Sequence, residues 1–197
     1  YLAIKGTDST WGYVLNHDKP GDWTADVITF LKSKAATIGA KGNVPQLLMA
    51  MESNNDVFGD SKNPYDPART SGGSSGGEGA LIALNLVNAG IGSDIGGSIR
   101  IPSLFCGIWG FKPTAGRLDY NASASLFHDH PFDGRSGEDQ HIIKATYGPM
   151  ARSAYDLTAL MKVLVEHSLS TWTNPPLPWR SVETPKRVGF VPEMTEY

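Results

Sequence analysis

Apolar side chains recur at helical spacing in the segment that follows Thr24-Ala25-Asp26. Val27, Phe30 and Leu31 occupy positions i, i+3 and i+4, which brings them onto one face of a helix. The polar residues ahead of them are typical of a helix start, and the lysines that follow suit the negative end of the helix dipole. We therefore predict an amphipathic helix that begins close to residue 25.

A second stretch with helical spacing follows Ser153. Ser153 and Asp156 have the spacing of a capping box, in which each side chain bonds to the main chain at the start of a helix. Apolar residues then continue at intervals of three and four. The sequence predicts a helix from about residue 154 whose apolar positions are Leu157, Leu160, Met161, Leu164 and Val165.

Other apolar runs are shorter and lack this spacing. Residues 78–84 are apolar nearly all round, which indicates a buried helix. Residues 36–40, 89–92 and 187–191 have the length and composition of strands, and residues 105–111 are expected to form another buried segment. Because helices and strands alternate along the chain, the predicted fold class is α/β.

Two stretches carry neither pattern. Residues 53–71 are rich in Asn, Asp, Pro and Gly and are expected to form a long loop. Residues 119–141 are polar and aperiodic, as in a variable surface insertion. His128, His130 and His141 fall in or next to this insertion, where solvated loop residues are a better interpretation than metal ligands, so we predict no metal site.

Composition and charge narrow the classes of function. Of the 197 residues, 40% are hydrophobic, which excludes a disordered chain. The net charge is −3 and the basic residues are scattered, so no nucleic-acid partner is expected and a small-molecule substrate is favoured. The longest apolar run is far short of the ~20 residues that cross a bilayer. The single cysteine, Cys106, lies in an apolar setting and is interpreted as an inert buried thiol in a reducing compartment.

The candidate chemistry lies in two glycine-flanked serine sites, Gly72-Gly73-Ser74-Ser75-Gly76 and Gly96-Gly97-Ser98. A phosphate-binding loop is disfavoured, because no Gly-Lys-Ser/Thr sequence is present and the glycines lack dinucleotide-binding spacing. The first site matches the nucleophile elbow G-x-S-x-G, but a polar loop precedes it where an elbow needs a strand. Serines that only cap helices would explain Ser74 or Ser75, but not Ser98 beside Asp94 and Arg100.

An interpretation that uses both serine sites is a serine hydrolase in which a second serine relays the proton of the nucleophile. A serine hydroxyl is a weak nucleophile, and where the base is not histidine a second serine can pass the proton to a neutral lysine. Glycines allow the two hydroxyls to approach each other. The stretch 93–98 would then direct a row of backbone N–H groups at one point, forming an oxyanion hole in which each donor is worth on the order of 3 kcal/mol. This chemistry favours cleavage of amides or esters.

These residues resemble the amidase signature family. Residues 72–82, GGSSGGEGALI, and residues 92–103, GSDIGGSIRIPS, resemble the two halves of the signature. The stretches FCGIWGFKPT (105–114), NVPQ (43–46), KGTDST (5–10) and GPMAR (148–152) are similar to the eukaryotic fatty acid amide hydrolase branch in particular. The resemblance runs from Lys5 to about Val191. It implies the amidase-signature fold, a mixed central sheet covered by helices on both faces.

The resemblance also implies roles for individual residues. Ser98 would be the nucleophile, and Ser74, beside a cis peptide bond, would be the relay of a Ser-Ser-Lys triad. The backbone N–H groups of Ile95, Gly96, Gly97 and Ser98 would form the oxyanion hole. Four residues would support these groups by hydrogen bonds, namely Ser75, Ser93, Asp94 and Arg100. No metal or organic cofactor is implied.

The base of the implied triad has no counterpart among these residues. In the family, the lysine lies in a Pro-x-Ser-x-Lys motif a few residues before the segment that matches Lys5-Gly6, so it would fall about two residues before Tyr1. Lys5 aligns elsewhere and is interpreted as a surface lysine. We therefore expect residues 1–197 to form one partial amidase domain that lacks the lysine motif and the C-terminal part, and the isolated chain to be inactive.

The expected reaction is hydrolysis of carboxylic amides, with fatty acid amides as the substrate class of the most similar branch. Two alternatives stay open. One is a glutamine amidotransferase subunit that passes ammonia to a partner enzyme, and the other is a catalytically dead, truncated pseudoenzyme. The expected location is intracellular and cytoplasmic, with a homodimer and peripheral membrane association as hypotheses for the intact protein.

Overall fold

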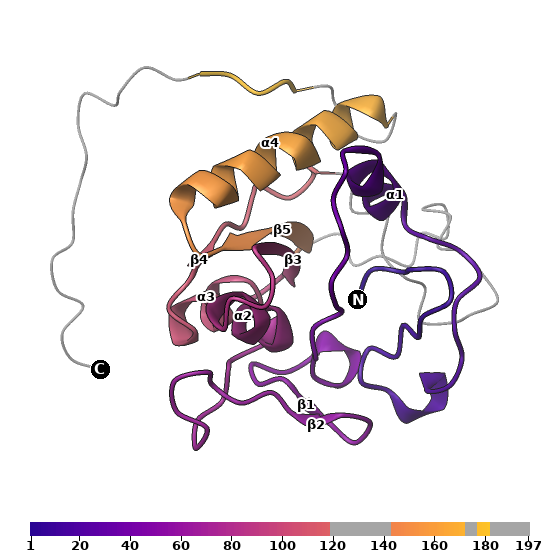
Figure 1. Ribbon diagram of the computed structural model, residues 1–197, viewed down its shortest axis with the longest axis vertical. Coiled ribbons are helices and arrows are strands. Elements are labelled where there is room, and N and C mark those ends of the chain that lie inside the picture. Colours follow the sequence, from indigo (N-terminus) through magenta and orange to yellow (C-terminus); the bar gives the residue numbers. More distant parts are fainter. Residues whose placement is uncertain (119–142, 172–176, 182–197) are drawn as a thin grey trace, which may run out of the picture.

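The computed structural model describes residues 1–118, 143–171 and 177–181 (Figure 1). The insertion predicted at 119–141 and the strand predicted at 187–191 lie outside the described residues. Among the described residues, no helix combines the length and apolar character that a bilayer crossing requires. In chain order, the elements are η1 (Val14–Asn16), α1 (Asp26–Ser33), η2 (Gln46–Leu48), β1 (Asn54–Asn55), β2 (Gly59–Asp60), α2 (Gly76–Ala83), β3 (Ala89–Asp94), α3 (Arg100–Phe105), β4 (Trp109–Gly110), β5 (Thr146–Ala151) and α4 (Ala154–Ser170).

The centre of the molecule is a three-stranded sheet in the order β3-β5-β4. Both pairs of adjacent strands, β3 with β5 and β4 with β5, are antiparallel. The register of β3 and β5 runs from Ala89 opposite Ala151 to Asp94 opposite Thr146. Every residue of β5 is buried, which requires cover on both faces. Figure 1 shows that cover, with α4 on one side of the strands and α2 and α3 on the other.

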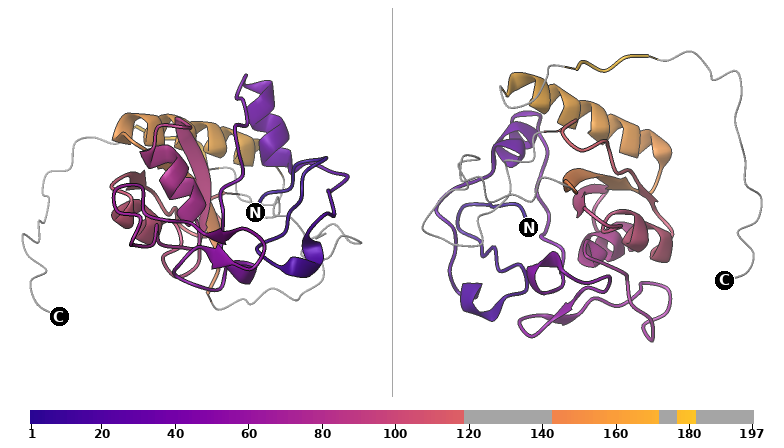
Figure 2. Two further views of the ribbon diagram at one scale, coloured as in Figure 1. Left: turned by 60° about the horizontal axis from the view of Figure 1, so that its bottom comes forward. Right: turned by 180° about the vertical axis from the view of Figure 1, so that it is seen from behind.

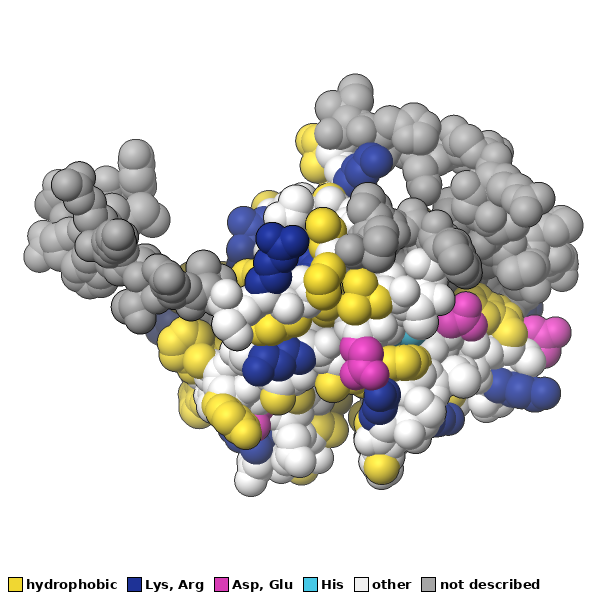
Figure 3. Space-filling model, turned by 90° about the horizontal axis from the view of Figure 1, so that it is seen from above, with side chains coloured by type: hydrophobic (Ala, Val, Ile, Leu, Met, Phe, Trp, Pro, Cys, Tyr) yellow, Lys and Arg dark blue, Asp and Glu magenta, His cyan; other side chains and the backbone are white. Residues whose placement is uncertain are grey.

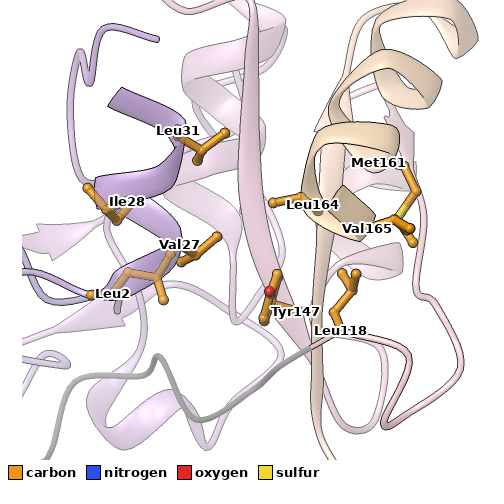
Figure 4. Packing of buried hydrophobic residues seen from close by; sticks show 10 residues of the cluster. Leu2, Val27, Ile28, Leu31, Leu118, Tyr147, Met161, Leu164 and Val165 are labelled. Carbon is orange, nitrogen blue, oxygen red and sulfur yellow. The ribbon is translucent and has the colours of Figure 1, made fainter. Parts of the chain in front are cut away.

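The larger core cluster joins the N-terminal segment, α1, β5 and α4. Figure 4 shows side chains of α1 and α4 converging with Tyr147 of β5 between them. Burial of this kind stabilises a fold by roughly 25 cal/mol for each Å² of apolar surface. Apart from the buried Ala25, its buried members are Leu2, Val27, Ile28, Leu31, Leu118, Tyr147, Met161, Leu164 and Val165.

A smaller cluster fixes the elements that carry the two serine sites. Ile82 of α2, Ile99 just before α3, and Met150 of β5 are fully buried against one another, with Val87 and Ile108 packed at the edge. Ile99 follows Ser98 directly, and Ile82 lies in the helix that follows Ser74. This cluster therefore holds both glycine-serine segments against the same strand.

The helices with clear apolar spacing are confirmed. The helix predicted near residue 25 is α1, with Val27, Ile28 and Leu31 buried. The helix predicted after Ser153 is α4, and Ser153 caps it, since its Oγ accepts a hydrogen bond of 3.0 Å from the N–H of Asp156. The Asp156 carboxylate accepts from the Ser153 hydroxyl at 2.6 Å, so half of the expected capping box is present. The strand predicted at 89–92 is present and extends to Asp94.

The predictions based on short apolar runs are partly wrong. Residues 36–40 form no strand and are almost all exposed. In the segment 105–111, Phe105, Trp109 and Phe111 are 46%, 55% and 44% exposed, because α3 ends there and β4 is a two-residue edge strand. The mixed sheet implied by the resemblance shows only antiparallel pairs among the described strands.

The surface over α4 carries both apolar and charged side chains. Figure 3 looks down on this side and shows hydrophobic side chains interspersed with lysine and arginine. One of the apolar residues of α4, Tyr155, is 82% exposed. Single exposed apolar residues are normal on a protein surface, so this face by itself indicates no binding partner.

Candidate active site

The two glycine-serine segments lie against each other. The N–H of Ser75 donates a 3.1 Å hydrogen bond to the carbonyl oxygen of Ser98. Ser74 and Ser75 are buried, Ser98 is half-buried, and the peptide bond between Gly73 and Ser74 is cis, as the resemblance implies. The backbones of both serine sites are therefore adjacent, while direct contact between Ser74 Oγ and Ser98 Oγ stays a prediction.

Ser75 also ties the start of α2 to the end of β3. Its hydroxyl accepts a 3.2 Å hydrogen bond from the N–H of Ser93 and donates to the carbonyl oxygen of Ser93 at 3.4 Å. A Cβ at Gly92 would lie 2.9 Å from Ser75 Oγ, so glycine is needed at this point of the strand. Both residues expected to support the site, Ser75 and Ser93, are thus in contact, with Ser93 acting through its backbone.

Asp94 organises the turn that leads into Ser98. Its carboxylate is 1% exposed and accepts hydrogen bonds from the N–H groups of Gly97 at 2.8 Å and Ile99 at 3.1 Å. The Arg100 side chain adds two more, from Nε and Nη2, each at 3.0 Å. Burial alone would raise the pKa of Asp94, but the hydrogen bonds from Arg100, Ile99 and Gly97 outweigh it and hold this pKa below its usual value.

The N–H groups expected to form the oxyanion hole differ in their contacts. The N–H of Gly97 donates to Asp94, which fixes the turn, and its part in an oxyanion hole stays a prediction. In the described part of the chain, the N–H groups of Ile95, Gly96 and Ser98 meet no acceptor, and Ile95 and Gly96 are exposed. Gly97 has a φ of +131°, a conformation that L residues with side chains rarely adopt. That these N–H groups bind an oxyanion stays a prediction.

The sequence pattern did not single out Ser53, which lies in the loop predicted at 53–71. Its hydroxyl contacts the main chain on both sides of Ser74, through the carbonyl oxygens of Gly72 and Ser74 and the N–H of Gly76. A polar, aperiodic loop contains no periodic signal that would identify such a residue. The run of glycines at 72, 73 and 76 indicates that something approaches closely, but not what.

A cavity of about 670 Å³ opens beside the first turn of α2. Ser75, Glu78 and Lys41 contribute polar groups to its wall, and most of the remaining lining is apolar. Burial raises the pKa of Glu78 to about 7, although hydrogen bonds from the N–H groups of Ile91 and Gly42 act in the opposite direction. A Cβ at Gly90 would collide with the Glu78 carboxylate, so glycine there makes room for it.

The positions of Lys5 and Lys41 bear on whether the described residues contain the catalytic base. Lys5 is exposed, as expected for a surface residue. Lys41 is half-buried, and burial lowers its pKa to about 8, partly offset by Asp8. Its Nζ donates to the carbonyl oxygen of Asp8 at 2.5 Å and to Ser9 Oγ at 2.9 Å, so its contacts lie in the N-terminal segment.

Two further features contain residue types that can be reactive: a cysteine thiol, and a cluster of two carboxylates with a histidine. Cys106 is fully buried, and burial raises its pKa to about 11, in line with an inert thiol. Asp8, His17 and Asp18 place one ligand atom each within 4.8 Å of one another, and His17 and Asp18 are exposed. His17 Nδ1 lies 3.1 Å from an Asp18 carboxylate oxygen, and the N–H of Asp18 bonds to Asp8. We assign no metal to this surface cluster, and the histidines at 128, 130 and 141 lie outside the described residues.

A glycine-rich turn held by a buried carboxylate thus lies beside a second, buried serine segment. Comparison with known proteins identifies the class of protein that contains them. The family model named Amidase matches residues 1–196. The chain belongs to the amidase family.

Relatives from fungi and animals cover nearly the whole chain. It is 41% identical over 181 residues to Amidase 1 of Gibberella moniliformis, a match that covers 90% of this chain and 32% of that protein. It is 36% identical over 195 residues to Fatty-acid amide hydrolase 1 of Sus scrofa, covering 96% of this chain and 32% of that protein. The chain spans about a third of the length of these curated relatives.

Comparison with solved structures supports both the family assignment and the amidase-signature fold. A structure described as Fatty acid amide hydrolase superposes with a TM-score of 0.82 at 35% sequence identity, covering 94% of this chain and 31% of that one. The predicted amidase-signature fold is therefore confirmed, as is the resemblance to the fatty acid amide hydrolase branch. The part of the fold described here is incomplete relative to that structure.

Proposed function

We propose that these residues form the catalytic core of a carboxylic amide hydrolase in which Ser98 is the nucleophile and Ser74 relays its proton. The observation that carries the proposal is the hydrogen bond from the Ser75 N–H to the Ser98 carbonyl oxygen, which brings the two serine segments together. Family membership supports amide hydrolysis. The individual roles are those that the resemblance to the amidase signature implies for these positions.

In the proposed reaction, Ser98 Oγ attacks the carbonyl carbon of the amide and its proton passes to Ser74 Oγ. Ser74 in turn gives a proton to a neutral lysine, so no charge accumulates on the relay. When the tetrahedral intermediate collapses, the carbon–nitrogen bond breaks and the proton returns through Ser74 to the departing nitrogen. Water then hydrolyses the Ser98 ester by the reverse use of the same groups and releases the acid.

The negative oxygen of the intermediate would bind to the N–H groups of Ile95, Gly96 and Ser98. Asp94 would hold the turn in this conformation through Gly97 and Ile99, with Arg100 neutralising its charge. Donors fixed before the reaction stabilise the transition state without reorganising during it. Ser75 and Ser93 would keep the turn in contact with the start of α2.

The proton acceptor of the proposed triad is a lysine supplied from outside these 197 residues. Lys41 is bound to Asp8 and Ser9, and Lys5 is exposed, so neither is proposed for this part. The chain alone would then hold the nucleophile, the relay and the oxyanion donors but not the base. Such a site retains only the rate that binding and the oxyanion hole provide.

We propose long-chain fatty acid amides as the substrate class, because relatives that cover most of this chain include a fatty-acid amide hydrolase. The same matches include proteins named only as amidases, so smaller amides are the next class to test. No cofactor enters the proposed reaction, because every step transfers only a proton or an acyl group. A homodimer and peripheral association with membranes are further hypotheses for the intact protein.

The test uses the gene product that contains residues 1–197, with an acyl anilide of long or short chain as substrate. We expect Ser98→Ala to abolish release of the aniline and Ser74→Ala to reduce it by about 10² to 10⁴, the usual contribution of a general acid–base group. Full activity of the Ser98→Ala variant would refute the proposal. If the wild-type protein instead hydrolyses glutamine and co-purifies with a partner enzyme, the amidotransferase alternative is favoured. If the wild-type protein turns over none of these amides, the pseudoenzyme alternative is favoured.

A further inference from the structure

We propose that Ser53 is a positioning residue for Ser74, in that its hydroxyl fixes the main chain before and after the relay serine. This inference rests on the proposed function, because it assigns Ser53 a part only if Ser74 transfers a proton. Ser53 lies in a loop 21 residues earlier in the sequence and belongs to neither signature segment.

The contacts of the Ser53 hydroxyl are unusually complete. Its oxygen accepts a 2.9 Å hydrogen bond from the N–H of Gly76, and its single proton is shared between the carbonyl oxygens of Gly72 at 2.9 Å and Ser74 at 3.1 Å. A hydroxyl has one proton to donate and two lone pairs, so the donor is fully used. Ser53 is 1% exposed, and water has no access to replace it.

Packing leaves no space between the Ser53 loop and the turn that holds Ser74. A Cβ at Gly73 would lie 2.8 Å from the backbone nitrogen of Glu52 and 2.9 Å from the carbonyl carbon of Met51. A Cβ at Gly76 would collide with the hydroxyl oxygens of Ser53 and Ser71. Glycine at 73 and 76 therefore allows the two backbones to touch, and this contact places the Ser53 hydroxyl within reach of the turn.

Ser53 is itself held from the opposite side. Its carbonyl oxygen accepts hydrogen bonds from the N–H of Ser61 at 2.8 Å and from Asn43 Nδ2 at 3.4 Å. The carbonyl oxygen of Ser61 in turn accepts from the N–H of Ser71 at 3.1 Å and from Ser71 Oγ at 2.9 Å. The loop is thus bonded to the chain that leads into Gly72, which makes it a rigid support.

The consequence concerns the leaving group. An amine leaves the tetrahedral intermediate only after its nitrogen is protonated, whereas an aryl ester expels a phenolate without help. If Ser53 positions Ser74, removal of the Ser53 hydroxyl should impair proton delivery, and so slow amide cleavage much more than aryl ester cleavage. A residue that only stabilises the fold would change both rates alike.

The test compares a p-nitroanilide with the p-nitrophenyl ester of the same acid, using the gene product that contains residues 1–197. We expect Ser53→Ala to lower kcat for the anilide about 10²-fold, the loss typical of a misplacement near 1 Å, and to lower it less for the ester, because both substrates need Ser74 to accept the Ser98 proton but only the anilide needs a proton on its leaving group. In the Ser74→Ala background, Ser53→Ala should cause no further loss for the anilide. Ser53→Cys, which keeps the shape of the side chain and a weaker, bulkier donor, should lie between wild type and Ser53→Ala.

The matched control is Ser168→Ala, which removes another buried hydroxyl, one that donates to the Leu164 carbonyl oxygen within α4. It should leave the anilide-to-ester ratio unchanged. Equal loss on both substrates in Ser53→Ala, or losses that add to those of Ser74→Ala, would overturn the inference. If Ser53→Ala does not fold, a wild-type ratio in Ser53→Cys overturns it equally. If Ser74→Ala itself leaves the ratio unchanged, the relay in the proposed function is wrong, which is a separate failure.

Discussion

Replacing Asp94 with asparagine tests the part of the structure that shapes the turn before Ser98. In the folded protein, one carboxylate oxygen accepts from Gly97 N and Arg100 Nη2, and the other accepts from Ile99 N, Arg100 Nε and, at 3.4 Å, Arg100 N. Asparagine keeps one acceptor oxygen but presents an NH₂ group to the donors on the other side. Asp94→Asn therefore removes about half of these hydrogen bonds and leaves buried donors facing a donor.

The size of the effect follows from burial and charge. A hydrogen bond to a charged group contributes about 1.5–3 kcal/mol, and at least two such bonds are lost, whichever oxygen the NH₂ group replaces. The Arg100 side chain is 56% exposed, so its share is screened and lies at the low end. Together these terms predict that the free energy of unfolding falls by about 3 kcal/mol.

The assay is urea unfolding followed by tryptophan fluorescence, at pH 7 and at lower pH. Because the folded-state pKa of Asp94 lies below its unfolded value, its contribution is complete above about pH 4 and is lost as the pH falls through the folded-state pKa. Asp94→Asn should lack this acid-dependent loss. Asp66→Asn is the matched control, since Asp66 pairs with the exposed Arg69 at 3.0 Å and should change stability by less than about 1 kcal/mol. Equal stability of the two variants would refute the reasoning.

Three further predictions concern titration, thiol reactivity and the isolated chain. The folded-state pKa of Glu78 is raised from 4.5 to about 7, so the unfolded state binds fewer protons between these values and stability should fall by about 3 kcal/mol as the pH rises from 4.5 to 7. Glu78→Gln should remove that slope in urea unfolding curves, and an unchanged slope would assign it to another group. Cys106 should react with an aromatic disulfide reagent only after unfolding, and rapid reaction of the native protein would contradict its burial. We expect the 197-residue chain alone to hydrolyse amides negligibly, and an N-terminal extension that places a lysine about two residues before Tyr1 to restore the reactivity of Ser98. Near-normal turnover without the extension would show that the base lies within the chain.

The parts of the fold that depend on local pattern were predictable from the sequence. The start of α4 follows from Ser153 and Asp156, and the position of α1 follows from Val27 and Leu31, because caps and helical spacing act within a few residues. Residues 36–40 and Trp109 were not predictable in the same way. Their exposure depends on which distant elements cover them, and an apolar run carries no information about its cover.

The features of the site also fall into two kinds, those that residues close in sequence indicate and those that depend on the folded chain. The two serine segments and the Asp94–Arg100 pair are identifiable from residues close in sequence, and the structure places them together. The engagement of the Gly97 N–H by Asp94 depends on the path of a turn, which composition does not specify. Ser53 reaches its partners across 19 to 23 residues, so only the folded chain reveals its contacts.

The most direct test of the account is to identify the residue that a fluorophosphonate modifies. The reagent phosphonylates an activated serine hydroxyl with loss of fluoride, and peptide mass spectrometry locates the added group. In the gene product that contains residues 1–197, we expect a single modified residue, Ser98, with labelling abolished in Ser98→Ala and slowed in Ser74→Ala. Stoichiometric modification of any other serine, or undiminished labelling of Ser98→Ala, would contradict the claim that Ser98 is the nucleophile.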